Sequence, residues 1–73
     1  MDLLVFVQGR RLGFEFKRTT APKFTPSMRS AMESLGLDRL VVLHAGDHVF
    51  PLARDVEAWP LVDWLRQRSA ASL

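Results

Sequence analysis

The chain has 73 residues, of which 48% are hydrophobic and 25% are charged. This length allows a single domain with a small core, and this composition is typical of a folded chain rather than a disordered one. The sequence contains no cysteine, which excludes disulfides, thiolate zinc sites and cysteine nucleophiles. Ten basic residues against eight acidic ones leave a formal charge of only +2, so charge alone does not indicate a nucleic-acid-binding protein.

The hydropathy pattern gives no sign of membrane insertion or export. No apolar run approaches the roughly 20 residues that a membrane-spanning helix needs. The apolar residues 3–7 are too few for a secretory signal. We therefore expect a cytoplasmic protein without a membrane partner.

The first two elements are predicted to form an antiparallel hairpin. Leu3–Val7 is a continuous, β-prone apolar run, which predicts a strand buried on both faces. A turn around Gly9 follows at Gln8–Arg11. Leu12–Lys17 then alternates apolar and polar side chains, as a half-buried strand does.

The next segment is predicted to be a helix from Pro26 to Leu35, after a loop over 18–24. Thr25 is a typical N-cap residue, Pro26 suits the first helical position, and Gly36 is a typical stop. The apolar residues in between follow at helical spacing: Met28, Ala31, Met32 and Leu35.

The second half is predicted to contain two short strands and a last helix. Leu40–Leu43 is apolar and β-prone, and the helix before it allows it to lie parallel to an earlier strand. After a turn at 45–48, Val49–Leu52 forms a return strand, which Pro51 places at the sheet edge. Pro60–Arg68 forms the last helix. The predicted order is β-β-α-β-β-α, which is a small mixed sheet of the α/β class with helix 26–35 packed on it.

The side chains of Asp2, Glu15 and Lys17 are expected to lie together at the open end of the first hairpin. A loop of Gly9-Arg10 places Asp2 opposite Lys17, whereas a loop of Gln8-Gly9 places Asp2 opposite Glu15. Both registers put all three side chains on one face, because directly opposed residues share a face and alternate residues of a strand do too.

This set of side chains has a chemical interpretation and a structural one. Two neighbouring carboxylates can bind a divalent cation such as Mg²⁺, with water completing its shell. A nearby Lys17 can orient an attacking water and stabilise developing negative charge, which suits metal-assisted phosphodiester hydrolysis. The alternative is a cross-strand ion pair between Asp2 and Lys17 with no catalytic role, since an acidic-x-Lys triplet is common by chance.

The same residues resemble a known motif. Asp2-Leu3-Leu4-Val5, a turn and then Leu12-Gly13-Phe14-Glu15-Phe16-Lys17-Arg18 resemble the Asp…(Asp/Glu)-x-Lys core of the PD-(D/E)XK nuclease superfamily. The longer series resembles the C-terminal domain of prokaryotic AAA+-type ATPases, which is usually grouped with that superfamily. It adds the helix end Ser34–Leu37, the strand Arg39–Leu43 and the hairpin around Gly46. The resemblance covers roughly residues 2–65.

The resemblance implies a fold, a site and partners. The fold would be a truncated restriction-endonuclease-like sheet, with Asp2 and Glu15 as metal ligands, Lys17 as the catalytic lysine and Mg²⁺ as cofactor. The substrate would be DNA, and the parent protein would carry an upstream ATPase domain. Residues 1–73 would be a single domain and a C-terminal fragment of that ATPase. The superfamily's upstream helix and first core strand are absent here, and Met1 stands where its motif has Pro.

A second functional hypothesis needs no catalysis. In it the chain is an interaction module that docks the ATPase, another copy or nucleic acid, and we expect this behaviour from the isolated chain. Arg18, Lys23 and Arg29 could contact phosphates in either case, or be solvated surface charges. The missing elements should leave an apolar sheet face or edge exposed, which predicts a symmetric dimer.

Other conspicuous side chains are expected to be structural. His44 and His48 flank the turn at 45–48, but no third metal ligand is evident nearby. Trp59 and Trp64 are expected to anchor the last helix to the sheet rather than to stack on bases.

Overall fold

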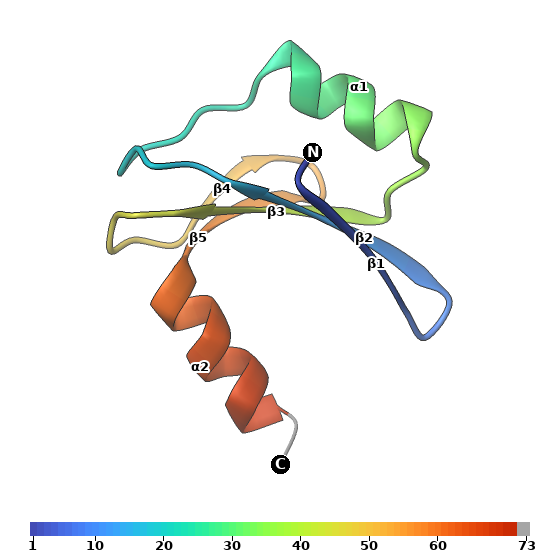
Figure 1. Ribbon diagram of the computed structural model, residues 1–73. Coiled ribbons are helices and arrows are strands. Elements are labelled where there is room, and N and C mark those ends of the chain that lie inside the picture. The colour runs from blue at the N-terminus through green and yellow to red at the C-terminus, as the bar shows by residue number, and fades with distance from the viewer. Residues whose placement is uncertain (72–73) are drawn as a thin grey trace.

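The computed structural model describes residues 1–71 and consists of one five-stranded sheet with a helix on each side (Figure 1). The strand order across the sheet is β1-β2-β3-β5-β4. The strands are β1 (Leu3–Val7), β2 (Arg10–Phe16), β3 (Arg39–His44), β4 (Phe50–Ala53) and β5 (Val56–Pro60). The helices are α1 (Pro26–Ser34) and α2 (Leu61–Ala71). In this part of the chain, no helix is long and apolar enough to cross a membrane.

The sheet is mixed, so the chain is a small α/β fold. β2, β3 and β5 run parallel to one another, and the two edge strands β1 and β4 run antiparallel to their neighbours. The parallel step from β2 to β3 requires a crossover, which α1 supplies. The prediction that Pro51 marks an edge strand is confirmed, because β4 forms the outer edge next to β5.

The predicted order of elements is wrong at one point, because it lacks β5. Val56–Pro60 is a strand between β3 and β4, with Val56 and Ala58 buried. This run is short, contains two residue types that strands disfavour, and ends in a proline that resembles a helix start. Burial between two strands outweighs these local preferences. The return strand β4 therefore pairs with β5 rather than with β3, and α2 begins at Leu61 instead of Pro60.

The first hairpin adopts one of the two predicted registers. Val7 pairs with Arg10 and Leu3 with Phe14, so the loop is Gln8-Gly9. Both loop residues have positive φ, 50° at Gln8 and 76° at Gly9, as two-residue hairpin turns require. This register places Asp2 opposite Glu15.

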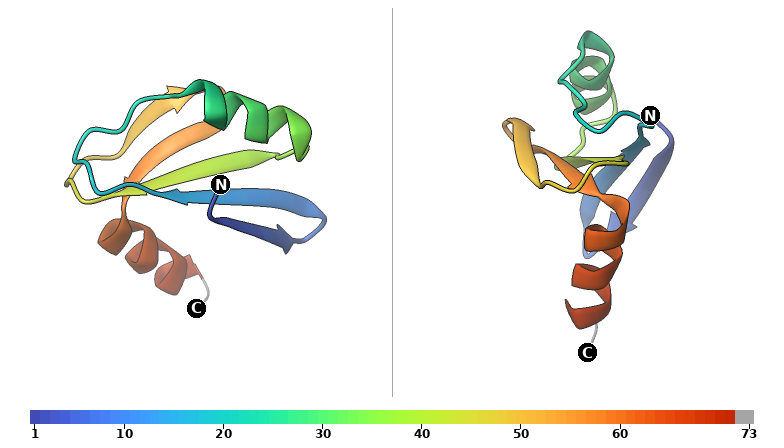
Figure 2. Two further views of the ribbon diagram at one scale, coloured as in Figure 1. Left: turned by 45° about the horizontal axis from the view of Figure 1, so that its top comes forward. Right: turned by 90° about the vertical axis from the view of Figure 1, so that its left-hand side faces the viewer.

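Helix α1 covers the middle of one sheet face (Figure 2). It begins as predicted: Met28 N–H donates to Thr25 Oγ1 at 3.2 Å, with Pro26 in the first turn. The helix ends at Ser34, one residue earlier than predicted. Met28 is fully buried in the core of this face, which also contains Leu37, Leu40, Val42 and Val56.

Helix α2 covers only part of the opposite face. Trp64 is buried there and packs edge-on against Trp59 and Phe14, with ring centroids 5.5 and 5.7 Å apart. The predicted anchoring role of both tryptophans is confirmed. The helix lies against β3 and β5 and leaves the same face of β1 and β2 uncovered (Figure 1).

Candidate functional site

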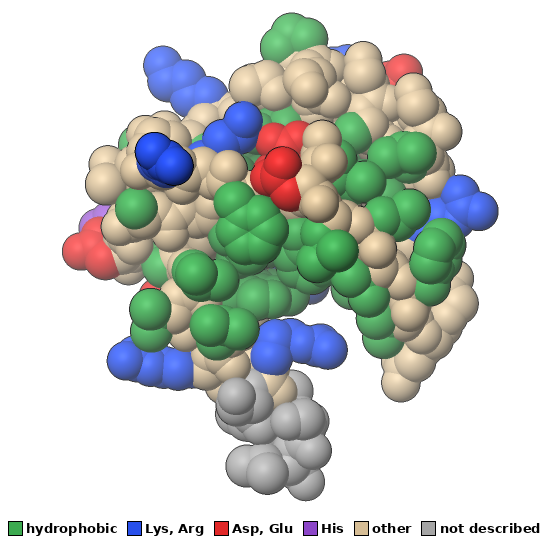
Figure 3. Space-filling model, in the orientation of Figure 1, with side chains coloured by type: hydrophobic (Ala, Val, Ile, Leu, Met, Phe, Trp, Pro, Cys, Tyr) green, Lys and Arg blue, Asp and Glu red, His purple; other side chains and the backbone are tan. Residues whose placement is uncertain are grey.

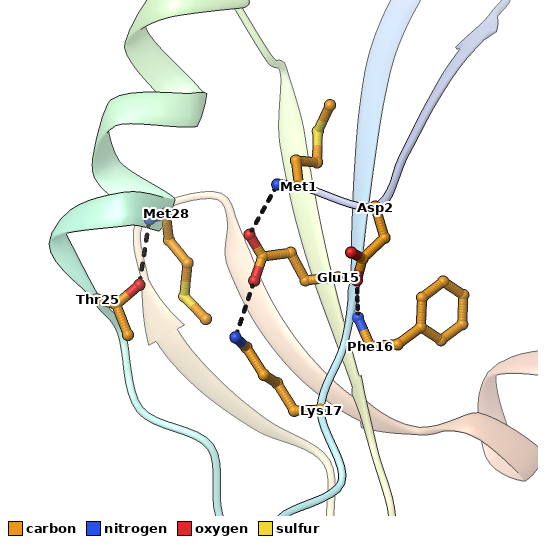
Figure 4. Close-up of polar contacts among 7 residues, drawn as sticks. All are labelled: Met1, Asp2, Glu15, Phe16, Lys17, Thr25 and Met28. Atoms are coloured by element: carbon orange, nitrogen blue, oxygen red, sulfur yellow. Dashed lines mark hydrogen bonds and ion pairs between the residues drawn. The ribbon is translucent and has the colours of Figure 1, made fainter.

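The most unusual charged residue is Glu15, near the end of β2 on the α1 side of the sheet. Only 6% of the residue is exposed. Its carboxylate lies between two cations: Lys17 Nζ is 3.5 Å from Oε2, and the Met1 ammonium is 3.6 Å from Oε1 (Figure 4). A buried carboxylate is costly unless such charges compensate it. Glu15 is therefore a position that attracts cations.

Asp2 lies beside Glu15 at the start of β1, and its carboxylate also has a defined partner. Phe16 N–H donates to Asp2 Oδ2 at 2.7 Å (Figure 4). Asp2 N–H donates to the Phe14 carbonyl at 3.0 Å. The structure thus joins Glu15 and Lys17 directly and holds Asp2 on the backbone next to them. The alternative ion pair between Asp2 and Lys17 is not formed, because Lys17 pairs with Glu15 instead.

The absence of a side chain at Gly13 leaves room for Met1 above β2, close to Glu15. A Cβ at position 13 would stand 2.6 Å from Leu37 Cδ1 and 2.7 Å from Met1 Sδ. Such distances are well inside van der Waals contact. The missing side chain therefore lets Met1 lie over β2, where its ammonium contacts Glu15.

A cavity of about 600 Å³ adjoins this cluster at the carboxyl ends of β2, β3 and β5. Ligands in open α/β sheets commonly bind at this end of the strands. The charged residues in its wall are Lys17, Arg18, Asp47, Asp63 and Arg66. Lys17 therefore belongs to both the Glu15 ion pair and the wall of the cavity.

The two histidines that flank the turn at 45–48 differ in their surroundings, and among the described residues the buried Nε2 of His44 has no hydrogen-bond partner. His44 is buried, accepts a hydrogen bond from Gly46 N–H at its Nδ1 (3.0 Å) and packs on Phe50. His48 is exposed beside Asp47. Across residues 1–71, no group of three or more His, Cys, Asp or Glu side chains is arranged to hold a metal ion.

The three basic residues proposed to contact DNA are spread along the molecule. Arg18 lines the cavity, whereas Lys23 is exposed in the loop before α1. Arg29 is exposed on α1, with its guanidinium 5.1 Å from the centre of the Phe24 ring. Only Arg18 is thus next to the Glu15 cluster.

The donor set of the cluster fits Mg²⁺ by type. Magnesium prefers carboxylate oxygens and keeps several waters or phosphate oxygens, so two carboxylates suffice in many sites. Glu15 in β2 and Asp2, which directly precedes β1, offer such oxygens, although both oxygens of Glu15 face a cation and one oxygen of Asp2 accepts the Phe16 N–H.

The sequence did not predict the cavity, although the expected parallel strands indicate where part of its wall lies. Residues that follow neighbouring parallel strands meet at one edge, which would place Arg18 beside Ala45 and Gly46. The sequence did not indicate that Asp63 and Arg66 line this cavity, because their position depends on β5, which was not predicted.

Comparison with known proteins finds a similarity to two mycobacterial proteins. The chain is 48% identical over 60 residues to an uncharacterised protein of Mycobacterium tuberculosis and, equally, to one of Mycobacterium bovis. The matched part is 82% of this chain but 14% of each relative, so the chain spans only a small part of their length. No family model matches the chain. No solved structure matches it either.

Proposed function

We propose that the chain is a nuclease-like module that hydrolyses phosphodiester bonds of DNA, with a truncated restriction-endonuclease-like sheet as its scaffold. In the full protein it is appended to an ATPase. The observation that carries the proposal is the nearly buried carboxylate of Glu15, paired with Lys17 and opposite Asp2, beside a cavity with basic side chains.

Each residue of the cluster has a role in this proposal. Glu15 and Asp2 hold Mg²⁺ through their oxygens. The bound ion supplies charge stabilisation and a more acidic water. Lys17 lies within reach of both the carboxylate and the cavity, so it orients the attacking water and stabilises negative charge on the phosphate. Arg18 and Arg66 bind the neighbouring phosphates along the cavity wall.

The proposal is tested by nicking of supercoiled plasmid DNA in Mg²⁺ or Mn²⁺. The full-length protein that carries this chain is expected to nick the plasmid. Lys17→Ala in that protein is expected to reduce the rate by about 10²-fold or more, because loss of one preorganised cation costs about that much. Arg54→Ala is the matched control. It also removes one positive charge, but its side chain is 97% exposed in the turn between β4 and β5.

Two outcomes contradict the nuclease proposal. One is the absence of nicking with either metal, and the other is nicking that Lys17→Ala leaves unchanged. Nicking reduced equally by Lys17→Ala and Arg54→Ala indicates a general effect of charge on DNA binding, and it also contradicts the assigned role of Lys17.

A non-catalytic interaction module is the second candidate. It is favoured by the Asp2 carboxylate, one oxygen of which already accepts the Phe16 N–H. In this case the Glu15–Lys17 pair only balances charge within the fold, and the chain docks the ATPase, DNA or a second copy. This candidate predicts no metal-dependent nicking and no effect of Mg²⁺ on DNA binding.

A further inference from the structure

A second concave feature lies on the opposite side of the sheet from Glu15. It is a groove of about 310 Å³ between α2 and the uncovered face of the β1–β2 hairpin. Figure 3 shows hydrophobic side chains gathered around this hollow. Its walls are apolar, with Leu3, Phe14 and Phe16 from the sheet and Leu61 and Leu65 from α2.

The groove exposes large apolar side chains to solvent. The exposed fractions are 48% for Leu3, 52% for Phe16 and 55% for Leu65. Contiguous apolar surface of this kind is rare on a soluble domain and marks interaction sites. We define Leu3, Phe14, Phe16, Leu61 and Leu65 as the docking groove.

The two strands β1 and β2 together are about as wide as one α-helix. Two strands at about 4.8 Å spacing occupy roughly 10 Å, which is the diameter of a helix with its side chains. On the same face, α2 lies against β3 and β5 and contacts β2 through Trp64 and Phe14, so most of β1 and β2 stays uncovered. The seven residues of β2 extend over about 23 Å, which corresponds to a helix of about 15 residues.

The charge around the docking groove selects among possible occupants. Arg68 lines the groove. Arg10, the strand partner of Val7, lies on the same sheet face near the hairpin turn. Neither residue forms an ion pair with another described residue. An occupant with acidic side chains would compensate both arginines.

A second copy of the chain is a poor match for this charge. Its most protruding apolar element is α2, which carries Arg66 and Arg68 against a single acidic residue, Asp63. Insertion of that helix would bring net positive charge to a basic groove. A flat lipid surface is also disfavoured, because the apolar side chains line a hollow rather than a protrusion.

We propose that the docking groove binds an amphipathic α-helix that has one apolar face and acidic flanking residues. The apolar face packs on Phe14, Phe16 and Leu65, next to and roughly alongside α2. The acidic side chains pair with Arg10 and Arg68. This proposal does not rest on the proposed catalysis. Glu15 lies on the opposite face of the sheet, although the groove shares Phe16 and Leu61 with the wall of the cavity beside Lys17.

The proposal is tested with two synthetic helical peptides of 15 to 18 residues and fluorescence anisotropy. Both carry leucine at helical spacing on one face, and their flanking positions are glutamate in one peptide and lysine in the other. The glutamate peptide is expected to bind the chain at least about tenfold more tightly at low ionic strength, with the difference shrinking in high salt.

Three variants localise the binding. Leu65→Glu is expected to weaken the glutamate peptide at least about tenfold, and Arg68→Glu to remove or reverse the preference between the two peptides. Arg54→Glu, a charge reversal at a residue distant from the groove, is expected to change neither. All three positions are exposed, so the variants retain the fold, which circular dichroism checks.

Several results overturn the proposal. The proposal fails if neither peptide binds or if both bind with equal affinity. It also fails if Leu65→Glu leaves binding of the glutamate peptide unchanged. A chain dimer that Leu65→Glu dissociates would assign the groove to a second copy. Binding to anionic vesicles that Leu65→Glu and Arg68→Glu both abolish would assign it to a lipid surface.

Discussion

The two faces of strand β2 differ in a way that reverses the usual expectation. On the α1 side, the charged Glu15 is buried, whereas on the α2 side the apolar Phe16, one residue further on, is half exposed. Buried charge and exposed apolar surface are the informative departures from normal burial. This difference is the basis of both proposals, a chemical site on the first face and a docking surface on the second.

The cause of this difference is the cover over each face. Met1, Leu37 and α1 close the face that contains Gly13 and Glu15. On the other face, α2 lies against β3 and β5 and touches β2 through the contact of Trp64 with Phe14. Because side chains alternate along a strand, β2 contributes residues to both proposed sites.

The largest expected effect distinguishes the covered face from the open one. Met28→Ala removes a fully buried side chain, so it should lower the free energy of unfolding by about 2–5 kcal/mol. Leu65→Ala is the matched truncation on the open face, where 55% of the residue is exposed. It should cost less than about 1 kcal/mol. Urea denaturation measures both, and similar losses at the two positions would contradict the contrast between the faces.

A smaller effect concerns two close approaches, one at Gly46 just beyond the carboxyl end of β3 and one at Gly13 in β2. A Cβ at Gly46 would lie 2.5 Å from the Thr20 carbonyl oxygen, which is backbone and cannot move aside easily. Gly46→Ala should therefore cost about 1–3 kcal/mol. Gly13→Ala meets only the ends of flexible side chains and should cost less. Thermal unfolding compares the two, and a larger loss at Gly13 would be the opposite of this expectation.

The smallest expected effect is the pH dependence of stability that arises from the contact between Arg39 and Glu57. The side-chain hydrogen bond from Arg39 is the main cause that holds the pKa of Glu57 below its ordinary value of 4.5. The ionised form is thus favoured in the folded state, and the resulting stability is present above about pH 4.5 and lost as the pH falls through the lowered pKa. Because the Glu57 side chain is 40% exposed, the contribution is below about 1 kcal/mol.

Glu57→Gln provides the measurement. The stability difference between the wild-type chain and this variant should shrink as the pH is lowered from 6 to 3, as followed by chemical denaturation. A difference that stays constant or grows on acidification would exclude the Arg39 contact as its source.

Local signals predicted much of the fold. Thr25 and Pro26 predicted the start of α1, and Pro51 predicted an edge strand, because capping and the missing proline N–H act within a few residues. The sequence left two hairpin registers open, and the positive φ of Gln8 and Gly9 accompanies one of them. Strand β5 was missed because its stability comes from β3 and β4 rather than from its own residues.

The candidate site was predicted in part. Alternation along β2 placed Glu15 and Lys17 on one face, and their contact agrees with that placement. The burial of Glu15 could not be predicted from neighbouring residues in the sequence, since it depends on Met1 and Leu37, which lie over Gly13. The docking groove combines β1–β2 with α2 and depends on strand order, which short-range patterns do not encode.

Paramagnetic broadening by Mn²⁺ tests most directly whether Glu15 belongs to a divalent cation site, as proposed. In nuclear magnetic resonance spectra, the backbone amide signals of Asp2 and residues 15–17 should broaden at the lowest Mn²⁺ concentrations. Glu15→Gln should abolish this pattern, whereas Glu57→Gln, the same substitution on the opposite face, should preserve it. Broadening that begins instead at exposed acids such as Asp47 or Asp55, or that persists in Glu15→Gln, would contradict the claim.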